Sequence, residues 1–134
     1  MPNEAWAVGE ARALMHTQTD PQQIRDALNR AIEANPMAIV PRRTLAEVEA
    51  SLPQPDLQSF REQFEQVLKI DPNDVQARLS YAQTLADRFN QRAEAAEQYR
   101  KALEYNDQLS PDEPKRLTPQ QVERVQARMR ELGA

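Results

Sequence analysis

The 134-residue chain contains no cysteine, one histidine (His16) and two glycines, and each scarcity excludes a class of protein. Without cysteine there is no disulfide scaffold, no thiolate zinc site and no cysteine nucleophile. A single histidine offers neither a histidine-rich metal cluster nor a choice of Ser-His-Asp arrangements. A β-sandwich or barrel needs more glycine and more aromatic residues than the 5% present. The 19 alanines, with abundant Arg, Glu, Gln and Leu, instead favour helices, and we expect no metal and no cofactor.

The charges are nearly balanced along the whole chain. There are 17 basic and 21 acidic residues, and no quarter of the chain departs from neutrality by more than two charges. The sequence therefore lacks the basic stripe of a nucleic-acid-binding protein and the polybasic segment of a membrane anchor. It also lacks a signal-peptide pattern and any apolar run near the roughly 20 residues of a membrane span. We expect a cytoplasmic protein, and 14 arginines among the 17 basic residues fit a GC-rich bacterial source.

Proline divides the chain into segments of helical length. Proline destabilises a helix interior but is tolerated in the first turn, and apolar residues recur at helical spacing between the prolines. The pattern predicts seven helices and no strand: about Asn3–Thr17, Pro21–Ala34, Pro41–Ser51, Asp56–Ile70, Asn73–Arg88, Gln91–Tyr105 and Thr118–Leu132. Capping-box pairs mark three of the starts: Asp20 with Gln23, Asn73 with Gln76, and Thr118 with Gln121. Gly133 is expected to end the last helix.

The helices contain an internal repeat. Three helix ends share a small residue, an aliphatic residue, a charge and an Asn/Asp turn, and their small residues Ala31, Val67 and Ala102 are about 35 residues apart. Helix-turn-helix units at this period resemble the tetratricopeptide repeat family. The third copy matches the family pattern best, at Tyr81, Ala82, Leu85, Ala95, Tyr99 and Ala102. The family glycine of the first helix is alanine in all three copies, at Ala11, Ala46 and Ala82.

The resemblance implies an all-α fold in which antiparallel helix hairpins stack into a superhelix. The whole chain, 1–134, would form a single domain of this kind. Its parts would be repeats at about 3–36, 37–72 and 73–107, a loop at 108–117 and a capping helix at 118–132. The apolar stripe of the last helix would cover the third hairpin, with Arg124, Arg128 and Arg130 facing water.

In the family, the first helix of each hairpin lines a concave groove that binds an extended or helical segment of another protein, without catalysis. Carried onto this sequence, the groove residues would be Arg12, Met15, Arg43, Glu47, Gln76, Leu79 and Gln83. Plainer interpretations stay open, because the two arginines can be solvated helix charges and Met15 can be core filler. One subfamily clamps C-terminal carboxylates with a Lys/Asn/Arg set, and no Lys-Asn pair stands at the corresponding places. A chaperone-tail clamp is therefore not expected.

Four functions are compatible with this pattern to different degrees. The resemblance favours a non-enzymatic scaffold or adaptor that binds a peptide or helix of a partner protein. The alternative is a homo-oligomer that assembles through its end helices, because Val122, Val125, Met129 and Leu132 have near-heptad spacing. An enzyme could use Glu47, Glu49 or Asp87, but no spacing supports a coupled acid pair. Reading of RNA is disfavoured by the acidity and the even spread of charge.

Overall fold

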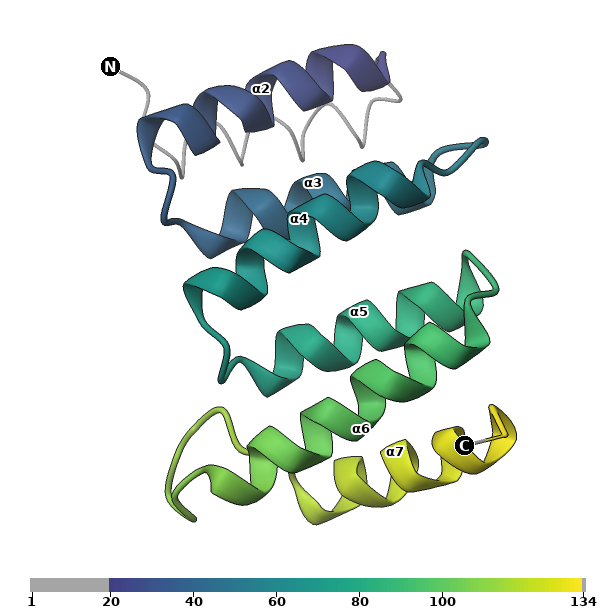
Figure 1. The fold of residues 1–134 in the computed structure, drawn as a ribbon. Coiled ribbons are helices and arrows are strands. Elements are labelled where there is room, and N and C mark those ends of the chain that lie inside the picture. The colour runs from purple at the N-terminus through teal and green to yellow at the C-terminus, as the bar shows by residue number, and fades with distance from the viewer. Residues whose placement is uncertain (1–19, 134) are drawn as a thin grey trace. The chain divides into compact units, whose positions relative to one another are not determined.

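The computed structural model describes residues 20–133, which form six α-helices and no strand (Figure 1). The helices are α2 (Pro21–Ala34), α3 (Ile39–Ser51), α4 (Leu57–Ile70), α5 (Val75–Asp87), α6 (Arg92–Gln108) and α7 (Pro119–Glu131). The all-helical prediction is confirmed for this part of the chain. The helix count there is six rather than the seven expected of the whole chain, because the first predicted helix, with Arg12 and Met15, lies outside the described residues.

The chain divides into two compact units between Ile70 and Asp71. In the first unit α3 packs against both α2 and α4, and in the second α6 packs against both α5 and α7. Short connections make α3 with α4, and α5 with α6, into helix hairpins (Figure 1). The division falls two residues before the predicted repeat boundary at 72. A single stacked domain over all 134 residues stays a prediction.

The first unit is built on the apolar stripe that the sequence predicts for α2. Ile24, Ala27, Leu28 and Ala31 are buried against two residues of α3, Leu45 and Val48. On α4, the rings of Phe60 and Phe64 meet edge to face with their centroids 5.1 Å apart, and both side chains are buried. Burial of apolar residues one helical turn apart is what holds these helices together.

One carboxylate lies inside this first unit. The Glu49 side chain on α3 is 2% exposed and accepts hydrogen bonds from Arg25 Nε at 2.5 Å and Arg25 Nη2 at 3.0 Å. The arginine comes from α2, and its hydrogen bond with Glu49 raises its pKa. A buried charge is tolerated when a bidentate partner of this kind compensates it. The pair therefore ties α2 to α3.

The core of the second unit takes residues from all three of its helices. Ala82 of α5, Tyr99 of α6 and Val125 of α7 are buried together. Four partly buried apolar residues surround them: Leu79, Leu103, Met129 and Leu132. The apolar stripe of α7 therefore packs on its own hairpin, as the sequence predicts for a capping helix.

The second unit also buries a cation without a carboxylate. Arg78 on α5 is 6% exposed, and its guanidinium carbon lies 4.8 Å from the centre of the Tyr105 ring. Its Nη1 donates to Gln98 Oε1 at 2.9 Å, and burial lowers its pKa. The aromatic face and the amide oxygen of α6 stabilise the charge in place of an acid. This contact holds the start of α5 against α6.

Two of the predicted helix starts hold and one is wrong. At α7 both bonds of the capping box form, since Gln121 N donates to Thr118 Oγ1 at 3.1 Å and Thr118 N donates to Gln121 Oε1 at 3.0 Å. Asp20 caps α2 but accepts from Gln22 N rather than completing a box with Gln23. The cap of α5 is Asp74, not Asn73.

Helix α5 begins later than predicted because Asn73 lies in a turn that the Asp71 side chain stabilises before the helix. The Asp71 carboxylate accepts from Asn73 N at 3.2 Å, and Asp74 Oδ1 then accepts from Ala77 N at 3.0 Å. Gln76 is thereby released from the predicted capping role and is available for a contact with another helix.

Two further boundaries differ from the predictions. Helix α3 begins at Ile39, two residues before Pro41. Pro41 is tolerated there because the N–H groups of the first turn have no partner within the helix. Helix α6 continues past Tyr105 to Gln108. Asn106, predicted to open the loop, is 3% exposed within the helix and accepts from Leu117 N at 2.7 Å. The end of α7 agrees with prediction, with Gly133 at φ 82°.

Candidate functional site

The predicted groove residues that the structure describes fall on one helix of each unit. Arg43 and Glu47 lie one turn apart on α3, while Gln76, Leu79 and Gln83 follow one another along α5. Residues at this spacing share a face of their helix. Because the two units are described separately, each group is a candidate surface by itself, and their union in one groove stays a prediction.

On α3, the two predicted residues differ in exposure. Glu47 is exposed and Arg43 is half-buried. The backbone carbonyl of Glu47 accepts from Ser51 Oγ at 2.6 Å, and the Glu47 side chain is open to solvent. The α3 face therefore offers a charged surface to a partner.

On α5, the capping helix covers two of the three predicted residues. The side-chain amides of Gln76 and Gln121 donate to each other's oxygens, at 3.2 and 3.1 Å. Leu79 packs against the core residues Ala82, Tyr99 and Val125. Only Gln83 keeps an exposed side chain. A partner can reach this face of α5 only where α7 leaves it uncovered.

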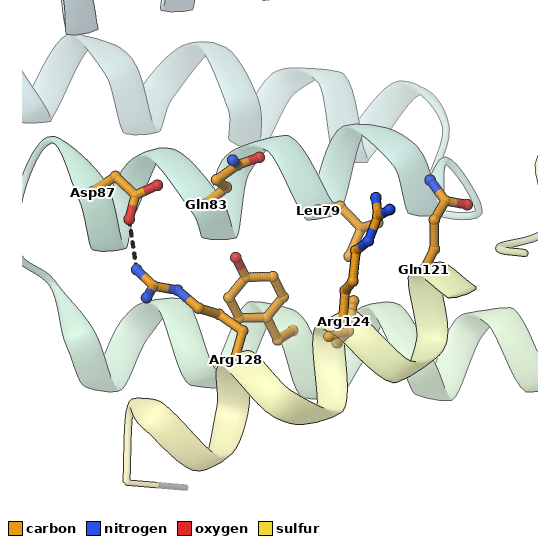
Figure 2. A pocket seen from close by; sticks show the side chains of 8 residues that line it. Leu79, Gln83, Asp87, Gln121, Arg124 and Arg128 are labelled. Carbon is orange, nitrogen blue, oxygen red and sulfur yellow. Dashed lines mark hydrogen bonds and ion pairs between the residues drawn. The ribbon is translucent and has the colours of Figure 1, made fainter. Parts of the chain in front are cut away.

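Such an opening exists between α5 and α7. It is a cavity of about 320 Å³ whose lining residues come from the three helices of the second unit: Leu79, Gln83 and Asp87 of α5, Tyr99 of α6, and Gln121, Arg124, Val125 and Arg128 of α7. Figure 2 shows Asp87 and Leu79 of α5 directed toward α7, and the side chains of Arg124 and Arg128 extending from α7 toward α5. The cavity is the place where predicted groove residues meet groups that other elements supply.

The charged groups of the cavity are unevenly paired. Arg128 Nη2 contacts Asp87 Oδ1 at 2.5 Å, and its Nη1 contacts Glu131 Oε2 at 2.8 Å. The hydrogen bond with Glu131 raises the pKa of Arg128, and burial raises the pKa of the Tyr99 hydroxyl beside it. Within residues 20–133 the exposed Arg124 side chain has no hydrogen-bond or ion-pair partner. One guanidinium of the cavity is thus satisfied and the other is not.

The arginines of α7 correct one expectation. The sequence predicts Arg124, Arg128 and Arg130 on a water-facing side. Arg124 and Arg130 are exposed, as predicted, whereas Arg128 is half-buried, and Arg124 and Arg128 both line the cavity. Gln121 and Arg128 lie four residues before and three residues after the buried Val125, and Arg124 lies three residues after Gln121 and four before Arg128, so all four residues fall on one side of α7. That spacing is the signal that could have placed the two arginines at the cavity.

The acids considered for catalysis are divided between the two units. Glu49 is buried in the first unit with Arg25, Glu47 is exposed on the same helix, and Asp87 pairs with Arg128 in the second unit. In the part of the chain that the structure covers, no group of three or more His, Asp or Glu residues could hold a metal ion. An enzymatic function stays untested by these positions.

Three of the four apolar residues proposed for self-association lie against their own chain. Val125 is buried, and Met129 and Leu132 pack beside it on the core of the second unit. Assembly through these residues would require α7 to leave its hairpin. Self-association stays a prediction.

Comparison with known proteins leaves the family unassigned, because no protein-family model matches the chain and neither does any curated protein sequence. None of the helices from α2 to α7 has the length and apolar character of a membrane-crossing segment. The helix hairpins and the cavity at α5 are therefore the features of the molecule that bear on its function.

Proposed function

We propose that the protein is a non-enzymatic scaffold that binds a peptide or helical segment of another protein through the first helices of its hairpins. The observation that carries the proposal is the cavity at α5. There the exposed Gln83 lines the same space as the apolar Leu79 and as Arg124, which has no ion-pair partner among residues 20–133. Amide and guanidinium groups next to apolar side chains suit a peptide, whose backbone is polar and whose side chains are varied.

The tetratricopeptide resemblance supports the same function independently of the cavity. Repeated helix hairpins cannot each bury their apolar stripe alone, so they stack and leave one face of each first helix open to a partner. Gln83 on α5 and Glu47 on α3 are exposed on such faces. A groove that joins the two helices, and a cytoplasmic location, belong to the proposal.

Affinity capture with matched variants tests the proposal. The test variant is Arg43→Glu/Gln83→Glu, and the control is Lys69→Glu/Gln126→Glu, which makes the same change of net charge at two exposed residues outside the predicted groove. Both must show the helicity of the wild type by circular dichroism. We expect the wild type and the control to retain a partner that the test variant loses. Retention by all three would contradict binding through these faces, and retention of the protein's own chain alone would favour self-association.

A further inference from the structure

Among residues 20–133, the cavity between α5 and α7 has one cationic side chain, Arg124, that makes no ion pair. Its charged lining residues are Asp87, Arg124 and Arg128. Arg128 contacts Asp87 at 2.5 Å and also Glu131, which does not line the cavity, at 2.8 Å. In Figure 2 the Arg124 side chain extends from α7 toward α5 beside Leu79, while the dashed line joins Arg128 to Asp87. The Arg124 guanidinium is exposed and has no acceptor on the described part of the chain.

We propose that this cavity binds the side-chain carboxylate of an acidic residue in the partner segment, with Arg124 as its ion-pair partner. The inference rests on the scaffold function proposed above and names the chemistry of its ligand. A guanidinium presents parallel N–H donors that match the two oxygens of a carboxylate, so the fit is geometric as well as electrostatic.

The charge count selects a monoanion. Asp87 keeps a carboxylate at the cavity wall, and its side chain is 48% exposed. A second negative charge on the ligand would meet this carboxylate with no further cation to offset the repulsion, because Arg128 already contacts Asp87 and Glu131. A single carboxylate therefore fits the cavity better than a phosphate dianion.

The apolar groups around Arg124 suit a side chain better than a chain terminus. The methylene groups of a glutamate can lie on Leu79 and Val125 while its carboxylate reaches Arg124. A volume of about 320 Å³ is at the small end of ligand pockets, which suits one side chain better than a whole helix.

Peptide titration followed by NMR tests the inference on the full chain. The probe is the blocked peptide acetyl-Ser-Leu-Glu-Leu-Ser-amide, and its glutamine counterpart removes only the charge. The variant Arg124→Gln is compared with Arg130→Gln, which makes the same change at an exposed arginine of α7 outside the cavity. We expect the glutamate peptide to shift the amide signals of Leu79, Gln83 and Val125, and to bind the wild type and Arg130→Gln equally.

Loss of either charge should weaken binding by about fivefold, the upper range for an exposed ion pair. Equal binding of the glutamate and glutamine peptides, or an unchanged affinity in Arg124→Gln, would overturn the inference. A glutamine peptide whose carboxyl end is left free is a further probe. If it binds more tightly than the blocked glutamate peptide, the inference is overturned in favour of a chain terminus. Preferential binding of inorganic phosphate would overturn it in favour of an anion site. If capture through Gln83 succeeds while the titration fails, the scaffold function stands without the carboxylate.

Discussion

Arg25→Leu should destabilise the first unit strongly, because it leaves the Glu49 carboxylate buried without its partner. The Glu49 side chain is 2% exposed, and both of its oxygens accept from Arg25, at 2.5 and 3.0 Å. Removal of one member of a buried pair costs about 3–5 kcal/mol, and the 28% exposure of Arg25 lets water return to part of the site. We therefore expect a loss of about 2–4 kcal/mol in the free energy of unfolding.

Urea unfolding followed by circular dichroism measures this loss, which corresponds to a midpoint shift of about 1–2 M at a slope of about 2 kcal/mol/M. Hydrogen exchange should place the weakening in α2 and α3. The double variant Arg25→Leu/Glu49→Leu should recover to within about 1 kcal/mol of the wild type, since apolar residues can replace a buried pair. Arg130→Leu, at an exposed arginine of the second unit, should leave the midpoint unchanged. A double variant as unstable as the single one would refute the account of an unpaired carboxylate.

Three further changes test local features. Thr118→Ala removes the cap of α7 and should cost about 0.5–2 kcal/mol, with faster hydrogen exchange in its first turn only; equal acceleration in α6 would contradict this. Asn106→Ala leaves the buried Leu117 N–H without its acceptor and should lower the free energy of unfolding in urea by about 1–3 kcal/mol. An unchanged free energy of unfolding would show that this hydrogen bond does not stabilise the fold. Hydrogen bonds from Arg100 lower the pKa of Glu97. The Glu97 carboxylate therefore stabilises the folded state at a pH above its ordinary pKa, and this stabilisation is lost as the pH falls. Arg100→Ala should raise the pKa of Glu97 in an NMR titration, and an unchanged pKa would refute the assignment.

The sequence predicts the helices well where local signals decide their ends. Helix α2 carries an uninterrupted apolar stripe between an aspartate cap with Pro21 and an Asn-Pro turn, and α7 has a complete capping box. The prediction of a helix end fails where a contact with a distant residue stabilises a residue of low helix propensity. Asn106 is a weak helix former, yet it stays in α6 because its side chain satisfies Leu117 eleven residues later.

The candidate site is only partly predictable for the same reason. The repeat spacing predicts Gln83 and Leu79 as site residues, because both lie on the first helix of a hairpin. The pairing of Arg128 with Asp87 spans 41 residues and depends on how α7 docks, which the apolar stripe alone does not specify. Burial of Arg78 is equally hidden, since arginine is normally exposed and the ring that shields it belongs to α6.

Site-specific photo-cross-linking tests the central claim most directly. A photoreactive amino acid replaces Gln83 at the cavity, and in a control chain it replaces Gln126, an exposed residue of α7 that does not line the cavity. The account predicts that a partner protein is cross-linked from position 83 and not from position 126. Equal cross-linking from both positions, or cross-linking from position 126 alone, would contradict partner binding at the α5 cavity.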